Sequence, residues 1–124
     1  MSTYMDRPEI VLWVRHADGR WSPRTVWVVV LSGEAYVRSA FGRRSAWYRR
    51  VLRHVDTEVE VAGVRLSVTL RPVDDPEIVQ RVSGAYRAKY GLSWPGPVES
   101  MNRPESAATT MRLTNVGQVS QLSA

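Results

Sequence analysis

The pattern of apolar and polar positions predicts β-strands over much of the first 73 residues. Ile10–Val14 is a short apolar run that predicts a first strand. Thr25–Leu31 is nearly all β-branched or aromatic without alternation, which is typical of a strand that is buried on both faces. Residues 57–61 and 64–73 instead alternate between apolar and polar side chains, as half-exposed strands do. A further strand over Ala35–Ser39 follows the second apolar run so closely that the two predict a hairpin.

Turn residues separate these segments. Ala17-Asp18-Gly19, Ser32-Gly33 and Ala62-Gly63 each place glycine, the residue that adopts turn conformations most readily, between two predicted strands. Trp21–Arg24 contains a proline, and because the residue before a proline avoids the helical region, we expect a loop there. The turns therefore join the predicted strands into hairpins.

Two stretches have the signals of helices. Ser45 is a good N-cap residue for a helix over 46–53, whose apolar side chains fall on one side. Asp75 is a good N-cap for a second helix over 76–90, which has proline at its first position and apolar residues at helical spacing. Gly91 is expected to end this helix as its C-terminal cap.

The remaining segments are predicted to be less regular. Residues 92–106 contain three prolines and one glycine, so we expect a long loop, and long loops in compact domains often carry function. Residues 107–114 are β-branched and apolar enough for a last strand. Residues 1–9 are expected to form a flexible lead-in and residues 115–124 a flexible tail, which leaves 10–114 as a single domain.

About six strands and two helices result from this reading. Strands that follow one another in hairpins, with helices set to the side, favour an antiparallel sheet curled into a small barrel. The predicted fold class is therefore mainly β (α+β). A doubly wound parallel fold would need a crossover helix after each strand, and none fits the pattern.

Composition narrows the function classes. An apolar fraction of 44% in 124 residues is enough for one core. The chain has no cysteine, which excludes disulfides, thiolate metal sites and cysteine nucleophiles. No apolar run approaches the roughly 18 residues that a membrane helix needs, and the first residues lack a signal core, so we expect a cytoplasmic protein without a membrane segment. His16 and His54 have no acidic residue at ligand spacing, so no metal site is predicted.

Charge is distributed unevenly along the chain. The net charge is +5 and 16 of the 17 basic residues are arginines. Between Glu34 and Asp56 there is no acidic residue but there are six arginines, namely Arg38, Arg43, Arg44, Arg49, Arg50 and Arg53. A local positive field of this kind selects anionic partners.

The residues around this arginine cluster suggest an anion site. Arg38, Ser39, Gly42, Arg43 and Arg44 supply guanidinium forks, a hydroxyl and a loosened backbone within seven residues, which are the donor types that hold a phosphate. A solvated, arginine-rich loop would show the same residues. A nucleic-acid surface is less favoured, because no RNA-binding or helix-turn-helix signature accompanies the charge.

Aromatic residues follow the cluster directly. Trp47 and Tyr48 either line a ring-binding pocket or belong to the core, and their helical spacing favours the core for Trp47. Trp94 lies between Ser93 and Pro95 in the predicted long loop, where it is a better candidate for a lid or an interface.

The order of these motifs resembles the flavin and deazaflavin split-barrel superfamily. In its deazaflavin-dependent nitroreductase branch a strand ends in Ser-Lys-Gly-Gly and is followed by Pro-x-Trp-Tyr, where this chain has Ser39-Ala40-Phe41-Gly42 and Ser45-Ala46-Trp47-Tyr48. Most of the chain is also similar to a bacterial family of unknown function, through the phrases VWVVV, AYVRSAFGRRSAWYR, AYRAKYG and ATTMRL. The chain departs from the nitroreductases at Ala40, where they have lysine, and at residues 21–25, where they have a Gly-Arg-Lys loop.

The resemblance implies a split β-barrel and a flavin- or deazaflavin-binding, oxidoreductase-like protein that acts on a small molecule. FMN or a deazaflavin would be held by its phosphate at Arg38, Ser39, Gly42, Arg43 and Arg44, with Trp47 and Tyr48 near the ring. It also implies a homodimer with the ligand site between subunits. The departures at Ala40 and 21–25 favour the alternative, a cofactor-free small-molecule binding or accessory protein on the same barrel. A nucleic-acid-binding module is the third choice.

Overall fold

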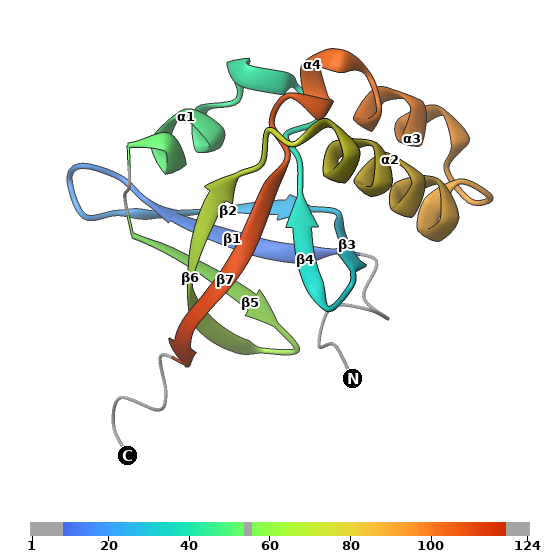
Figure 1. Ribbon diagram of the computed structural model, residues 1–124. Coiled ribbons are helices and arrows are strands. Elements are labelled where there is room, and N and C mark those ends of the chain that lie inside the picture. The colour runs from blue at the N-terminus through green and yellow to red at the C-terminus, as the bar shows by residue number, and fades with distance from the viewer. Residues whose placement is uncertain (1–8, 54–55, 119–124) are drawn as a thin grey trace.

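The computed structural model describes residues 9–53 and 56–118, which form one antiparallel sheet with helices at one end (Figure 1). The order of the strands in the sheet is β2-β1-β5-β6-β7-β4-β3. Within the described residues the strands are β1 (Ile10–Arg15), β2 (Trp21–Val26), β3 (Val28–Leu31), β4 (Glu34–Val37), β5 (Thr57–Val61), β6 (Val64–Pro72) and β7 (Met111–Gln118). The helices are the 3₁₀ turn η1 (Gly42–Arg44) and the α-helices α1 (Ala46–Leu52), α2 (Pro76–Tyr90), α3 (Pro95–Met101) and α4 (Pro104–Ala107).

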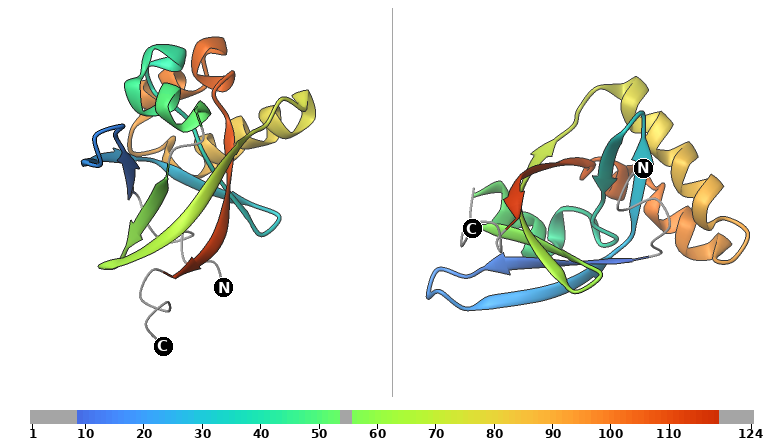
Figure 2. Two further views of the ribbon diagram at one scale, coloured as in Figure 1. Left: turned by 90° about the vertical axis from the view of Figure 1, so that its left-hand side faces the viewer. Right: turned by 90° about the horizontal axis from the view of Figure 1, so that it is seen from below.

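The two edge strands of the sheet are consecutive in the chain, and this makes the sheet curl. β2 and β3 lie at opposite ends of the strand order, yet only Trp27 separates them. The chain passes from one edge to the other at this residue, so the sheet has to curl into a half-barrel, as the two turned views show (Figure 2). The predicted class, a mainly β antiparallel split barrel, is confirmed.

Two predictions about this first part of the chain were wrong. The loop expected at Trp21–Arg24 is part of β2, and the single buried strand expected over Thr25–Leu31 is divided at Trp27. Pro23 is tolerated because β2 is an edge strand that pairs with β1 alone, so the missing N–H can face away from the ladder. The apolar run does form β-structure, but its two halves belong to strands at opposite edges of the sheet.

The predicted hairpin turns are confirmed. β3 and β4 pair around Ser32-Gly33, and β5 and β6 pair around Ala62-Gly63. Both central residues of each turn have positive φ, 53° and 80° in the first turn and 54° and 80° in the second. Positive φ at both positions is the requirement of the type I′ turn, whose twist matches that of the strands.

The two predicted helices are confirmed within a residue at each end. Asp75 accepts hydrogen bonds from the backbone N–H of Glu77 (2.9 Å) and of Ile78, and so caps α2. α1 ends at Leu52, with Arg53 as its C-cap.

The segment 92–106 differs from the prediction, because it contains α3 and α4 rather than an irregular loop. Pro95 and Pro104 are the first residues of these helices, where a missing N–H has no consequence. The last strand, expected over 107–114, lies at Met111–Gln118. Most of the predicted lead-in and part of the tail, together with His54, lie outside the described residues.

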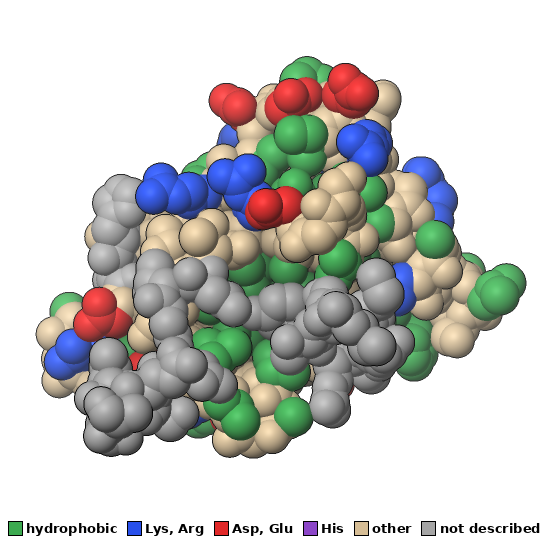
Figure 3. All heavy atoms as spheres, turned by 60° about the horizontal axis from the view of Figure 1, so that its bottom comes forward, with side chains coloured by type: hydrophobic (Ala, Val, Ile, Leu, Met, Phe, Trp, Pro, Cys, Tyr) green, Lys and Arg blue, Asp and Glu red, His purple; other side chains and the backbone are tan. Residues whose placement is uncertain are grey.

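Acidic side chains gather at one edge of the face shown in Figure 3. Asp74, Asp75 and Glu77 are exposed at the start of α2, where negative charge stabilises the positive end of a helix.

In the described part of the chain, no helix is long and apolar enough to span a membrane. The same residues include no group of three or more potential metal ligands.

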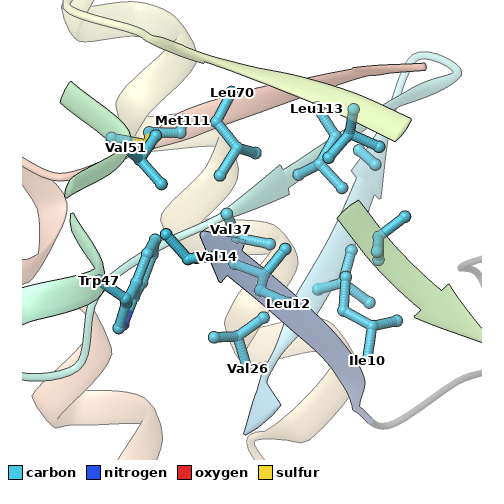
Figure 4. Packing of buried hydrophobic residues seen from close by; sticks show 14 of the residues in the cluster. Ile10, Leu12, Val14, Val26, Val37, Trp47, Val51, Leu70, Met111 and Leu113 are labelled. Atoms are coloured by element: carbon cyan, nitrogen blue, oxygen red, sulfur yellow. The ribbon is translucent and has the colours of Figure 1, made fainter. Parts of the chain in front are cut away.

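The core has two parts. The first fills the barrel and includes Leu12, Val37 and Trp47, which point toward one another from three different elements (Figure 4). The second lies between the α2–α3 pair and the β3–β4 hairpin, and consists of Val29, Tyr36, Val82, Tyr86, Tyr90, Val98 and Met101. The second part fixes α2 and α3 against the barrel and so positions the side chains described next.

Candidate functional site

A groove of about 1680 Å³ opens beside the barrel. Its walls are residues 24–27 at the end of β2, residues 40–47 before and at the start of α1, and residues within 96–108 from α3, α4 and the turn between them. Its volume exceeds the range of roughly 300 to 1,000 Å³ that is usual for small-molecule sites. A ligand with several rings and a phosphate therefore has enough room.

Gly42 allows two walls of the groove to meet. Its φ is +67°, a conformation that favours glycine, and an added Cβ would lie 3.2 Å from the backbone oxygen of Glu105 in α4. Ser106, also in α4, donates from Oγ to the carbonyl of Ala40 at 3.1 Å. The predicted loop is thus held rigidly against a helix that lies more than 60 residues further along the chain.

Arg38 is 1% exposed and its donors are directed at protein acceptors. Its Nε donates to Oγ1 of Thr110 (2.8 Å), Nη1 to the carbonyl of Met101 (3.0 Å) and to Oδ1 of Asn102 (3.1 Å), and Nη2 to the carbonyl of Val79 (2.8 Å). This arginine therefore ties the end of β4 to α2 and to the end of α3, and it also lines the groove.

The charge of Arg38 is satisfied by neutral acceptors in the part of the chain that the structure describes. No carboxylate of the described residues forms an ion pair with it. Its guanidinium lies 5.4 Å from the centre of the Tyr86 ring. Burial lowers the pKa of Arg38 from its ordinary value, but an arginine remains charged under such conditions. Burial also raises the pKa of the Tyr86 hydroxyl, so Tyr86 stays neutral and Arg38 leaves a net positive field beside the groove.

Ser39 is fully buried and is not among the described residues that line the groove. Its side chain therefore has no direct access to a ligand. Its backbone N–H donates to Oγ1 of Thr109 at 2.8 Å, and its Oγ lies 2.5 Å from Oγ of Ser45. Ser45 is half-buried and lines the groove. Of the two hydroxyls, Ser45 is the one that faces the space for a ligand.

Arg43 and Arg44 are exposed in η1 and line the groove. Among the described residues neither side chain forms a hydrogen bond or an ion pair, in contrast to Arg38. Arg24 and Arg103 are exposed on the other two walls. Together Arg24, Arg43, Arg44 and Arg103 form a basic rim around the groove.

The groove is electropositive as a whole. Among the described residues, five arginines line it, namely the basic rim and Arg38, while the acidic residues in the lining are Glu9 and Glu105. Clefts lined by one sign of charge concentrate ligands of the opposite sign. The arrangement therefore suits an anionic ligand with an apolar body.

Trp47 and Tyr48 are both buried, at 7% and 5% exposure, and their rings meet edge to face with centroids 6.3 Å apart. Both belong to the barrel core, as their spacing favoured for Trp47. Trp47 also borders the groove. Trp27 lines the groove from the end of β2 and stacks on Tyr90, with ring centroids 4.2 Å apart.

Sequence reasoning brought together Arg38, Ser39, Gly42, Arg43 and Arg44, and all five lie at or beside the groove. It missed Arg24, Trp27, Ser45 as a lining residue, and Arg103. Arg103, the residue before α4, lies beside Arg43 and Arg44 in the basic rim only because α4 packs on η1. No local sequence signal marks a contact between segments that lie so far apart in the chain.

Comparison with known proteins places the fold and the family. The chain is similar in structure to Campylobacter jejuni ChuZ, with TM-score 0.65 and 11% identity over 87% of this chain and 47% of that chain, so it spans about half the length of ChuZ. It is similar to an F420-H2 dependent reductase (FDR-A), with TM-score 0.61 and 17% identity over 89% of this chain and 96% of that one. It is also similar to HutZ, the heme storage protein from Vibrio cholerae, with TM-score 0.62 and 12% identity over 93% and 84%.

Sequence comparison gives a family without an activity. No curated protein matches the chain. A family model described as "Uncharacterized protein conserved in bacteria (DUF2255)" matches residues 3–113. At the identities above, the structural likenesses establish a shared fold.

Proposed function

The chain belongs to this DUF2255 family of bacterial proteins, and we propose that it is an oxidoreductase-like protein that binds a flavin or a deazaflavin in the groove. When bound, such a cofactor supplies hydride transfer to or from a small molecule. The protein would supply binding, orientation and the exclusion of water. This division of labour agrees with a chain in which no protein nucleophile motif was found.

The observation that carries the proposal is the pair of exposed arginines in η1. Arg43 and Arg44 have no acceptor among the described residues, and they face a groove that also borders the buried charge of Arg38. Guanidinium groups bind phosphate through pairs of charge-assisted hydrogen bonds. The donor set thus fits the phosphate of FMN or of a deazaflavin.

The other predicted site residues would act around this contact. Arg38 and Ser39, whose polar atoms bond to the protein, would hold the loop and strengthen the field. Gly42 would let η1 lie against α4. Trp47, which lines the groove and meets the Tyr48 ring edge to face, would border the ring of the cofactor.

The residues that line the groove support a flavin or a deazaflavin more than a haem. The reductase among the structural neighbours depends on F420-H2, by its name, whereas HutZ stores heme. Haem iron is held by a histidine, a cysteine or a tyrosine, or by a methionine together with a histidine. The described residues that line the groove include no histidine, cysteine or tyrosine.

The test is a titration of the purified protein with FMN, followed by its visible absorption. We expect binding to the wild type, and a loss of affinity of about 100-fold or more in the Arg43→Ala/Arg44→Ala variant, because each of the two lost charge-assisted bonds contributes about 1.5–3 kcal/mol. Arg49→Ala/Arg53→Ala is the matched control, since both arginines are exposed outside the groove and the change in net charge is the same.

A colourless protein that binds neither FMN nor a deazaflavin would instead support the alternative, a cofactor-free small-molecule binding or accessory protein. Ala40 is the observation that favours this alternative. Its short apolar side chain lines the groove at the position where the deazaflavin-dependent nitroreductases, which the sequence resembles, have lysine. A nucleic-acid-binding module, the third choice, would show binding that weakens steeply between two salt concentrations.

A further inference from the structure

Two serine hydroxyls form an isolated pair at the edge of the groove. Oγ of Ser39 lies 2.5 Å from Oγ of Ser45, and either atom could be the donor on distance alone. The Ser39 side chain is 0% exposed and has no other hydrogen-bond partner among the described residues. Ser45 is half-buried and lines the groove. The two hydroxyls therefore differ in what else they can reach.

This difference fixes the direction of the hydrogen bond. A hydroxyl carries one proton, and a buried donor without an acceptor is destabilising. If Ser45 donated, the proton of Ser39 would be buried without an acceptor. If Ser39 donates, its proton is satisfied by Ser45, and the proton of Ser45 remains available on the side of the groove. The second arrangement leaves no buried group unpaired.

The proton of Ser45 has no other use within the described residues. Ser45 is the N-cap residue of α1, yet its side chain makes no capping hydrogen bond. Its neighbours in the groove wall are Arg43 and Arg44, whose guanidinium groups are also without an acceptor. Three donors from adjacent positions in the chain thus share one groove.

We propose that Ser45 donates its hydroxyl proton to a phosphoryl oxygen of the ligand, and that Ser39 is the positioning residue that sets the direction of this donation. The inference rests on the proposed function, in that it takes the anionic group of the ligand to be a phosphate. A phosphate monoester has three oxygens that accept hydrogen bonds, enough for Ser45 and both arginines. A hydroxyl that already accepts a hydrogen bond is polarised and donates more strongly.

The first experiment measures affinity for FMN, for riboflavin and for inorganic phosphate. Ser45→Ala should weaken the binding of FMN and phosphate by about 10- to 100-fold, and should leave riboflavin, which lacks the phosphate, nearly unchanged. Ser45→Thr should restore the affinity because it keeps the hydroxyl. Ser67→Ala is the control, since Ser67 is a half-buried serine on β6 that lies outside the groove.

The second experiment measures thermal stability without ligand. Ser45→Ala leaves the buried proton of Ser39 without an acceptor and should lower the melting temperature more than Ser39→Ala, which leaves no buried donor. The double variant Ser39→Ala/Ser45→Ala should recover the melting temperature of Ser39→Ala but not the affinity for phosphate. Ser39→Ala alone should weaken FMN relative to riboflavin at nearly unchanged stability, a result that a purely structural role would not give.

The outcomes separate this inference from the proposed function. If the wild type binds FMN and Ser45→Ala binds it equally well, the role of Ser45 is overturned and the proposed function stands. If the wild type binds inorganic phosphate but no flavin or deazaflavin, the proposed function fails, and weakened phosphate binding in Ser45→Ala still supports Ser45 as a phosphate donor. If the wild type binds none of the probes, both fail. Equal losses of melting temperature in the two single variants would overturn the assigned direction.

Discussion

Arg38 and Arg43 lie five residues apart in the sequence, and the folded chain uses their guanidinium groups differently. Arg38 is buried and donates to acceptors on α2, on the end of α3 and at Thr110 just before β7. Arg43 is exposed on the groove without an acceptor among the described residues. One arginine therefore supports the scaffold and the other is available to a ligand, although residue type alone does not distinguish them.

The first prediction compares the stability of two matched variants. Arg38→Met should lower the free energy of unfolding by about 3 kcal/mol or more, because it leaves several buried acceptors without a donor. Arg43→Met should change it by less than about 0.5 kcal/mol, as exposed substitutions without partners usually do. Urea denaturation of both variants measures the difference. Equal shifts of the two midpoints would mean that the network around Arg38 contributes little.

At the scale of elements, the hairpins and α2 could be predicted because their signals are local. The Ser32-Gly33 turn and the Asp75 cap each depend on residues adjacent in the chain, so the sequence contains the whole cause. The division of the apolar run at Trp27 could not be predicted. Two consecutive strands at opposite edges of a sheet have the same apolar, β-branched composition as one buried strand.

The helices α3 and α4 were missed for a different reason. Both are short and begin with proline, so their propensity is weak and most of their stability comes from packing. Val98 and Met101 of α3 are buried in the cluster against α2, and α4 rests on η1. The residue types of the candidate site could be predicted from the sequence, but the wall that α4 supplies could not, because contacts such as Gly42 to Glu105 join distant segments.

The second prediction tests the approach of η1 to α4. Gly42→Ala should be more destabilising than Gly33→Ala, although both glycines have positive φ (67° and 80°). Gly33 has nothing within 4 Å of an added Cβ, so its substitution measures backbone strain alone, about 1–2 kcal/mol. At Gly42 the Cβ would also press on the backbone of α4 at 3.2 Å, which adds a further cost of about 1–3 kcal/mol.

Binding provides an independent measurement for the same pair of variants. Because Gly42→Ala would push α4 away from η1, it should also weaken FMN binding, whereas Gly33→Ala in the distant hairpin turn should not. Unfolding midpoints and FMN titrations of the two variants check both parts. If Gly42→Ala were as stable as Gly33→Ala and bound FMN normally, the close contact would have no role in shaping the groove.

At the scale of the whole molecule, the groove and the exposed apolar side chains raise the question of assembly. Phe41 is 73% exposed and lines the groove, while Leu92 is fully exposed outside it. The resemblance implies that the ligand site lies between two subunits, in which case a second copy would cover the side of the groove that includes Phe41. A symmetric dimer would bury the same patch on both copies.

The last prediction follows from that geometry. In solution the mass should be twice the 14.0 kDa of one chain, and Phe41→Asp should shift it toward one chain by placing a charge within the interface. Leu92→Asp introduces the same charge at a larger apolar exposure but away from the groove, so it should leave the dimer intact. Light scattering across a dilution series measures both variants. Dissociation by Leu92→Asp alone would place the interface elsewhere, and a monomeric wild type would mean that each groove binds its ligand without a partner subunit.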